Sequence, residues 1–255
     1  MTNEHRCIFA DVCKYAGQEL YCHDYCFPFR KAHGESGDGG LVGLSQIPKK
    51  YRACRVSNLP IKGENPETYE AIVSICENIE VFIDGGVGLY LYSTPNKLNP
   101  KGTGTGKTTS ACTIGNTYLA HRIQQHIKGI REIKGTTPVL FVKMSQLQNK
   151  YNSQFRGTKE MQEQSSKEFY KLKKTMIETD LLIVDDIGLR GSTEAFTNEF
   201  YEVIDDRATD EKACIFTSNI PLDEIGGVLS EQIESRIYGS TEQLDFRGRD
   251  YRRVK

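Results

Sequence analysis

The sequence predicts an α/β fold, in which a parallel sheet is flanked by helices, with a small additional unit at the N-terminus. A glycine-rich loop lies between an apolar run, Gly88–Ser93, and a long helical pattern that opens at Lys107. The apolar residues 181–184 fit a strand that is buried on both faces of a parallel sheet. Cysteines cluster within residues 7–26, which sets the N-terminal segment apart from the rest.

The glycine-rich loop has the composition of a phosphate-binding P-loop. Its alternating glycines let the backbone curl with N–H groups pointing inward, and it leads into a helix N-terminus that favours an anion. Lys107 adds a positive charge for the β- and γ-phosphates, and the Thr108 hydroxyl can ligate Mg²⁺. A flexible Gly/Thr linker is the alternative, which the flanking strand and helix disfavour. The residues predicted to bind ATP are Gly102, Thr103, Gly104, Thr105, Gly106, Lys107, Thr108 and Thr109.

The start of this loop departs from the usual pattern, G-x-x-x-x-G-K-[ST]. Position 101 is Lys101 where the pattern has glycine, and Gly102 follows one place later, after the loop-like residues 94–100. We therefore expect a longer approach to the phosphate loop and a first turn of a different shape. The part expected to touch phosphate, Gly104 to Thr109, is intact.

Length and charge limit the function classes. The chain has 255 residues and a formal net charge of −1, so nucleic-acid binding would have to come from a local patch. We expect no membrane-spanning segment and no signal peptide, because no apolar stretch is long enough and residues 1–7 are polar. A cytoplasmic protein with one main core, a small accessory unit and no membrane partner is expected.

The clustered cysteines predict a metal site. Four soft ligands in a segment too small for its own core suggest tetrahedral Zn²⁺, and cysteines in a cytosolic-type chain argue against disulfides. An iron–sulfur cluster and unliganded thiols are the alternatives. The expected zinc ligands are Cys7, Cys13, Cys22 and Cys26.

The remaining elements are predicted from the positions of glycine, proline and asparagine and from the spacing of apolar residues. Residues 34–40 are predicted to be a linker, so the expected domains are 1–40 and 41–255. Asn65 and Pro66 predict a helix start, with asparagine as the N-cap, and apolar residues at helical spacing continue to Phe82. Further strands are expected at 138–142, 180–187 and 213–219, and further helices within 146–179, from 196 to 207 and over 230–237.

The apolar run 181–184 ends in two aspartates. Ligands sit at the carboxyl ends of strands in open α/β sheets, so Asp185 is expected to hold Mg²⁺ together with Thr108. Asp186 is placed to polarise the attacking water, and Asn219 at the tip of the next strand can orient it. A surface turn is the alternative for the two aspartates, which the upstream P-loop disfavours.

Five motifs in order resemble the AAA+ ATPases of the DnaC/DnaI helicase-loader group and their relatives, the IstB-type transposition ATPases. The resemblance covers about residues 48–255. The motifs are the P-loop, Leu-Leu-Ile-Val-Asp-Asp-Ile-Gly at 181–188, Thr-Ser-Asn at 217–219, Ser-Arg-Ile at 235–237 and Asp-Tyr-Arg-Arg at 250–253.

The resemblance implies roles for individual residues. It implies that Lys107 and Thr108 are Walker A residues, Asp185 and Asp186 Walker B residues, and Asn219 sensor 1. It further implies that Arg236 is an arginine finger acting in trans, which requires self-association into an AAA+ oligomer. Arg252 would be a sensor 2-like arginine on its own γ-phosphate, and the usual helical lid is not expected.

The resemblance also implies partners. The N-terminal zinc unit of such loaders contacts a replicative hexameric DNA helicase, and the helical insert between the second and third strands contacts single-stranded DNA. Stacking aromatics and basic side chains would be the means, with helix packing and solvated charge as the alternative. The candidates are Tyr151, Phe155, Arg156 and Lys159.

The expected function is therefore ATP-dependent loading of a replicative helicase onto single-stranded DNA during replication initiation. The expected cofactors are ATP, Mg²⁺ and Zn²⁺. Two alternatives remain open. One is an IstB-like accessory ATPase of transposition, which would bind duplex DNA and a transposase. The other is a nucleotide-switched adaptor that hardly turns over.

Overall fold

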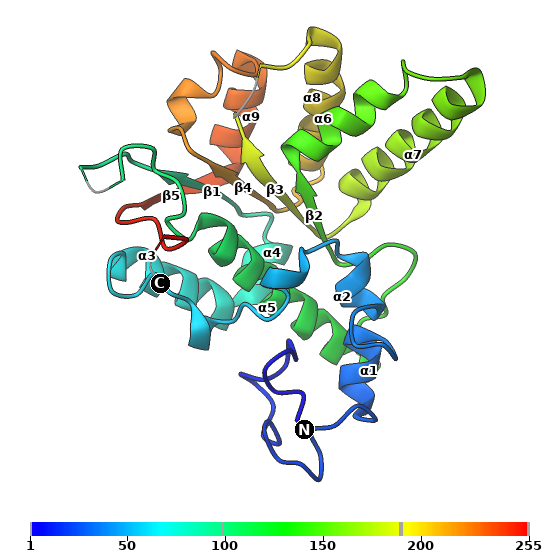
Figure 1. The fold of residues 1–255 in the computed structure, drawn as a ribbon, viewed down its shortest axis with the longest axis vertical. Helices are drawn as coiled ribbons and strands as arrows, with labels where there is room; N and C mark the ends of the chain where they lie inside the picture. Colours follow the sequence, from blue (N-terminus) through cyan, green and yellow to red (C-terminus); the bar gives the residue numbers. More distant parts are fainter. Residues whose placement is uncertain (1, 98, 189–190, 254–255) are drawn as a thin grey trace.

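The fold centres on one parallel sheet (Figure 1). A computed structural model describes residues 2–97, 99–188 and 191–253; Met1 and the end of the predicted basic tail, Val254 and Lys255, lie outside the described residues. Across these ranges five strands pair in the order β2-β3-β4-β1-β5, all parallel. The predicted α/β class with a parallel sheet is confirmed. The strands are β1 (Gly88–Ser93), β2 (Val139–Lys143), β3 (Leu181–Ile187), β4 (Cys214–Ser218) and β5 (Thr241–Phe246).

Helices cover both faces of the sheet. In Figure 1, α3, α4 and α5 lie on one side and α6 to α9 on the other, while α1 and α2 lie beside α5. The helices are α1 (Phe27–His33), α2 (Gly40–Leu44), α3 (Pro66–Glu77), α4 (Ile79–Asp84), α5 (Lys107–Ile127), α6 (Met144–Ser153), α7 (Lys159–Glu178), α8 (Glu194–Thr209) and α9 (Glu231–Ser240).

The inner strand β3, which lies between β2 and β4, is buried on both faces, as the apolar run predicts. Leu181 and Ile183 belong to the hydrophobic cluster under α5, whereas Leu182 and Val184 belong to the cluster under α6 to α9. This two-sided burial fixes the register of β3 between β2 and β4. Because β3, β4 and β1 are parallel neighbours, their carboxyl ends lie at the same edge of the sheet.

Three local predictions are corrected. The helix expected to run through to Phe82 is two helices, because Asn78 leaves helical geometry (φ −111°, ψ 31°) between α3 and α4. Asn65 does not cap α3 with its side chain. It instead bonds the backbone of Arg247 twice, at 2.8 and 2.7 Å. The edge strand β5 has no counterpart among the predicted strands, because most of its residues are polar.

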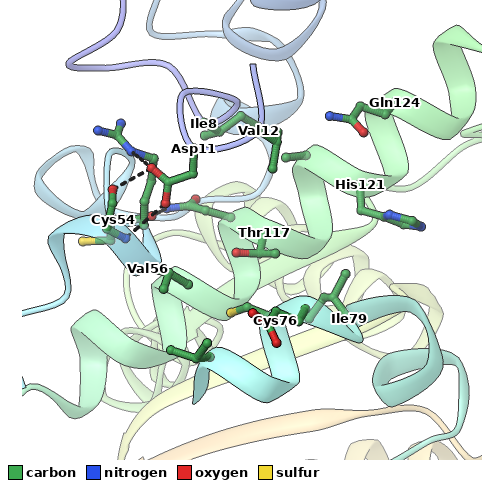
Figure 2. A pocket seen from close by; sticks show the side chains of 16 residues that line it. Ile8, Asp11, Val12, Cys54, Val56, Cys76, Ile79, Thr117, His121 and Gln124 are labelled. Atoms are coloured by element: carbon green, nitrogen blue, oxygen red, sulfur yellow. Dashed lines mark hydrogen bonds and ion pairs between the residues drawn. The ribbon is translucent and has the colours of Figure 1, made fainter. Parts of the chain in front are cut away.

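The N-terminal segment packs directly on the core. Ile8 and Phe29 are buried in the same hydrophobic cluster as α5. Asp11 forms an ion pair with Arg55 at 3.1 Å and also accepts the hydroxyl hydrogen of Ser57. A cavity of about 630 Å³ lies beside this contact, between the segment and helices α3 and α5. Figure 2 shows Val12 on its N-terminal wall.

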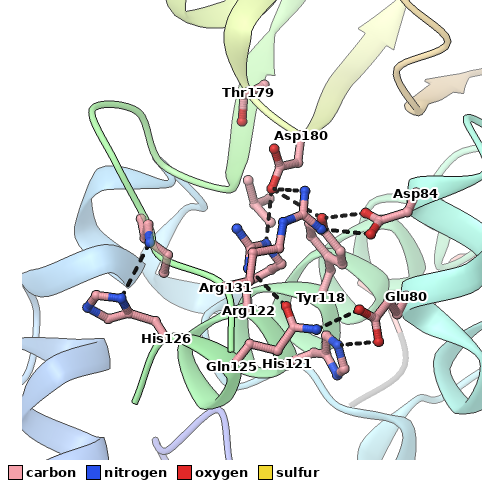
Figure 3. Close-up of polar contacts among 12 residues, drawn as sticks. Glu80, Asp84, Tyr118, His121, Arg122, Gln125, His126, Arg131, Thr179 and Asp180 are labelled. Atoms are coloured by element: carbon pink, nitrogen blue, oxygen red, sulfur yellow. Dashed lines mark hydrogen bonds and ion pairs between the residues drawn. The ribbon is translucent and has the colours of Figure 1, made fainter. Parts of the chain in front are cut away.

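A polar cluster joins the other end of β3 to α4 and α5 (Figure 3). Asp180, just before β3, accepts from Arg122 at 3.1 Å and from the Tyr118 hydroxyl at 3.1 Å. Arg131 bonds Asp84 at 2.7 Å and lies 3.8 Å from Asp180. Asp180 and Asp84, which are 30% and 38% exposed, therefore each face a guanidinium of the chain.

None of the helices within the described ranges combines the length and the apolarity that a membrane crossing requires.

Candidate nucleotide site

The P-loop surrounds an open cavity at the carboxyl edge of the sheet. Gly104 (φ 69°) and Gly106 (φ 103°) adopt left-handed geometry, which lets the backbone curl between β1 and the first turn of α5. The cavity has a volume of about 720 Å³. Residues 103–109 line it together with Asp185, Asp186 and Asn219, and Pro48, Tyr51 and Pro60 form a further wall. The loop, both aspartates and the asparagine thus share one site.

The unusual start of the loop has a structural explanation. The Asn99 side chain donates to the Thr103 carbonyl at 2.7 Å and accepts the Thr103 N–H at 3.3 Å, and the Gly102 N–H donates to the Asn99 carbonyl at 3.1 Å. Gly102 takes the left-handed conformation (φ 58°). An asparagine turn followed by Gly102 therefore shapes the first bend, and Lys101 is not required to be glycine.

Lys107 is held inside the site by neutral oxygens. Its ammonium group donates to the Ser93 hydroxyl, to the Gly102 carbonyl at 3.0 Å and to Asn219 Oδ1 at 2.9 Å. Burial, reinforced by the charge of Arg252, lowers the pKa of Lys107 to about 8, although Asp186 and Asp185 act in the opposite direction. A phosphate group would restore the missing negative charge, so the geometry suits an anionic ligand.

The side-chain partners of Asp185 in the described ranges are two hydroxyl groups. Its Oδ1 accepts from Thr108 Oγ1 at 2.7 Å and from Thr217 Oγ1 at 2.8 Å, and the residue is 5% exposed. Burial, followed by the charge of Asp186, raises the pKa of Asp185 above its ordinary value. A carboxylate and a threonine hydroxyl in contact are hard oxygen donors, so they fit Mg²⁺.

Asp186 has a strained backbone and a cationic neighbour. Its φ of 62° is uncommon for a residue with a side chain, and its N–H donates to Thr217 Oγ1 at 3.0 Å. Its carboxylate lies 3.2 Å from Lys143 Nζ, at the end of β2. Lys143 and Thr217 were missed as site residues; the Thr-Ser-Asn motif contains Thr217, but nothing in the sequence singles out Lys143.

The two predicted arginines lie in different places. Arg252 lines the cavity, next to Tyr251. Arg236 lies on α9 outside the lining of this cavity, where its side chain is 49% exposed and pairs with Asp205 at 2.7 Å. Within its own subunit Arg236 therefore does not reach the nucleotide site.

The cysteines surround a separate cavity of about 320 Å³. Cys7, Cys13, Cys22 and Cys26 all line it, together with His23. In residues 2–97, 99–188 and 191–253, however, no group of three or more His, Cys, Asp or Glu residues is close enough to hold a metal ion. Four thiols are donors that suit zinc, but in this structure the described cysteines are not arranged as a metal site.

The four DNA-contact candidates divide by exposure. Tyr151 is 8% exposed and its ring packs against Phe155, Phe169 and Phe196 at 5.3 to 5.6 Å, so for this candidate the structure supports the alternative, helix packing. Phe155 is 65% exposed, and Arg156 and Lys159 are exposed beside it.

Three solved structures show the same fold at low sequence identity. "Crystal Structure of the DnaI" is 17% identical with a TM-score of 0.57 and covers 79% of this chain and 95% of its own. "Crystal structure of the DnaC helicase loader" is 20% identical with a TM-score of 0.55 and covers 78% of this chain and 100% of its own. "Replication initiator DnaA bound to AMPPCP and single-stranded DNA" is 19% identical with a TM-score of 0.55 and covers 80% of this chain and 51% of its own.

The sequence comparisons give the family. A search of curated proteins finds no match. Residues 98–254, more than half of the chain, match the family described as IstB-like ATP binding protein. This match begins before the P-loop and spans Asp185, Asn219 and Arg252. The chain therefore belongs to the IstB-like ATP-binding family, and it is an ATPase with a P-loop AAA+ fold.

Proposed function

We propose that this protein is a cytoplasmic ATP-dependent loader of a replicative DNA helicase. The observation that carries the proposal is one cavity lined by the P-loop, Asp185, Asn219 and Arg252, while Arg236 lies outside it. The fold is shared with a DnaI structure and with a DnaC helicase loader. Lys107→Ala is expected to abolish ATP binding; retained affinity in equilibrium titration contradicts the assignment of the site.

The residues of the cavity divide the work of hydrolysis. Lys107 would leave Ser93 and Asn219 to hold the phosphates, and Asn219 would then be free to orient water. Thr108 and Asp185 would hold Mg²⁺, which neutralises charge on the phosphates when bound. Asp186 would orient the attacking water, which requires its carboxylate to separate from Lys143.

Arg236 is proposed to complete the site of a neighbouring subunit. Its exposure on α9 and its distance from its own cavity support action in trans. Arg236→Ala should leave ATP affinity intact and remove hydrolysis. Mixing it with Lys107→Ala, which supplies an intact Arg236, should restore part of the turnover. Unchanged turnover of Arg236→Ala alone places the finger elsewhere.

The N-terminal residues 1–40 are proposed to be the zinc-binding, helicase-contacting domain. Large apolar side chains are exposed there, including Leu20 (75%), Tyr25 (81%) and Phe27 (62%). A Leu20→Ser/Tyr25→Ser variant of the full chain should lose capture of a purified replicative helicase. Tyr238→Ser, which alters an equally exposed aromatic (69%) on α9, is the matched control and should retain it. Equal capture by both variants contradicts this surface.

Zinc is proposed to draw the four sulfurs around their shared cavity into one tetrahedral site. Metal analysis of the full chain should find one zinc ion per molecule. Cys22→Ser and Cys26→Ser should lose it, and Cys214→Ser, which alters a buried cysteine of the sheet, should not. Absence of zinc from the purified chain contradicts the four-cysteine site.

Single-stranded DNA is proposed to contact the exposed end of α6 and the start of α7. Phe155→Ala should weaken binding of an oligonucleotide at all salt concentrations, whereas Lys159→Ala should reduce the salt dependence as well. Unchanged affinity in both variants contradicts the placement.

The family match keeps a second function open. An IstB-like accessory ATPase of transposition would bind duplex DNA rather than capture a helicase. Helicase capture together with ATPase stimulation by single-stranded DNA favours the loader. Preference for duplex DNA without helicase capture favours transposition, and ATP binding with negligible turnover under all conditions favours a nucleotide-switched adaptor.

A further inference from the structure

The segment 247–253 forms a strap across the loop that leads to the phosphate site. Arg247 exchanges two backbone bonds with the Asn65 side chain, and Arg249 is held by Glu64 through its N–H and its guanidinium, both at 2.7 Å. The Asn96 side chain donates to the Gly248 carbonyl at 3.3 Å. Figure 1 shows this red segment beside the loop between β1 and α5. The strap therefore joins the start of α3 to the approach of the P-loop.

The strap contacts the P-loop itself through two consecutive residues. The Tyr251 N–H donates to the Gly104 carbonyl at 3.0 Å. The Asp250 carboxylate accepts the Arg252 N–H at 3.0 Å through Oδ1, and the Thr103 hydroxyl lies 3.5 Å from its Oδ2. A Cβ on Gly104 would stand 1.7 Å from Asp250 Oδ1, so only glycine leaves room for this carboxylate. Asp250 is mostly enclosed, with 14% of its side chain exposed.

These contacts fix the backbone of Arg252 relative to the phosphate loop. Arg252 lines the nucleotide cavity, and the residue before it is bonded to Gly104. We propose that Asp250 is a positioning residue that locks Arg252 onto the P-loop, and that this lock lets the site distinguish ATP from ADP. The proposal rests on the proposed function, because it assumes that Arg252 meets the γ-phosphate.

The contact geometry indicates which property would be lost without Asp250. The loop N–H groups would bind phosphates that ATP and ADP share, and Lys107 would bind one shared phosphate as well as the terminal one, whereas Arg252 would meet the terminal phosphate alone. An arginine whose backbone is not held has more conformational freedom to lose on binding. Removal of the lock should therefore weaken ATP binding and leave ADP binding nearly unchanged.

The test compares dissociation constants for Mg²⁺-ATP and Mg²⁺-ADP across variants of the full chain. Asp250→Ala should weaken ATP binding about tenfold and change ADP binding less than about twofold, the scale of one charge-assisted contact. Asp250→Asn keeps an oxygen for the Arg252 N–H and should retain most of the discrimination. Asp250→Leu fills the same space without an acceptor, and it replaces the alanine variant if that variant does not fold.

Two further variants separate positioning from general loosening of the strap. Asp250→Ala/Arg252→Ala should bind ATP no more weakly than Arg252→Ala, because both changes remove one interaction. Glu64→Ala releases Arg249 and should lower the thermal midpoint while ATP discrimination persists. Additive losses in the double variant, or equal loss of discrimination in Glu64→Ala and Asp250→Ala, overturn the proposal. If the wild type binds neither ATP nor ADP, the proposed function itself is refuted.

Discussion

Aspartates lie close to both ends of strand β3, and their partners differ in charge. At its start, Asp180 faces Arg122 and Arg131 and accepts from Tyr118. Near its end, Asp185 is 5% exposed, and its side-chain partners among the described residues are the hydroxyls of Thr108 and Thr217. The first carboxylate is compensated by cations of the chain, whereas the second is buried and has no cation bonded to it within the described part of the chain.

This difference separates a structural charge from a functional one. The Asp180 carboxylate is already paired with the buried guanidinium of Arg122, and leaving that guanidinium without its partner is costly. A buried carboxylate with hydroxyl partners alone has a raised pKa, and its surroundings favour either a proton or a metal ion. Asp180 is partly exposed and paired with cations, whereas Asp185 is buried and bonded to hydroxyls, so Asp185 is the one whose surroundings suit a metal ligand.

The largest expected effect is on hydrolysis. Asp185→Asn should reduce the ATP turnover rate about a thousandfold. Asp185 is proposed to hold Mg²⁺, and a metal-bound phosphate gains several kcal/mol of transition-state stabilisation. Steady-state phosphate release measures it. Asp180→Asn, the same chemical change at the other end of the strand, should keep turnover within about threefold of the wild type. Equal losses in both variants contradict the division between the two ends.

The second prediction concerns stability at the start of β3. Asp180→Ala leaves the guanidinium of Arg122, which is 4% exposed, without its carboxylate. The free energy of unfolding should fall by about 3 kcal/mol. Denaturant unfolding measures this change, and Asp210→Ala, which removes a carboxylate from the exposed pair with Lys212, should cost less than about 1 kcal/mol. A cost for Asp180→Ala no greater than for Asp210→Ala contradicts the structural role.

The third prediction uses Lys107. Its pKa of about 8 is lowered mainly by burial, and nucleotide phosphates should raise it again. At about pH 8 roughly half of the lysines are neutral, so ATP binding should take up about half a proton per site. Calorimetry in buffers of different ionisation enthalpy measures this uptake. Lys107→Arg keeps its positive charge at this pH, so ATP binding to this variant should take up no proton at this position. A binding enthalpy that does not depend on the buffer contradicts the lowered pKa.

The same comparison shows what sequence could predict. The strand at 181–184 could be predicted from its continuous apolar run. The role of the two aspartates after it could be predicted because a P-loop precedes them in the sequence. Asn65 was expected as a cap, yet its amide bonds Arg247, 182 positions away in the chain. Lys143 meets Asp186 only because β2 and β3 are neighbours in the sheet. Sequence reasoning finds residues that share a motif and misses partners that only the topology brings together.

The final and smallest effect is the stability cost of Asp185 itself. Its folded-state pKa lies above the unfolded value, so the folded chain holds the proton more tightly. Stability should therefore fall as pH rises through the interval between the two values, and remain lowered at neutral pH. Asp185→Asn should raise the thermal midpoint near neutral pH, with a smaller gain in acid.

Mg²⁺ sharpens this last test. The ion should raise the thermal midpoint of the wild type, because a cation compensates the buried carboxylate, and it should leave Asp185→Asn unchanged. Asp180→Asn should respond to Mg²⁺ as the wild type does, although its midpoint starts lower. A midpoint that falls in Asp185→Asn without Mg²⁺ would mean that this carboxylate, like Asp180, is already compensated by the chain.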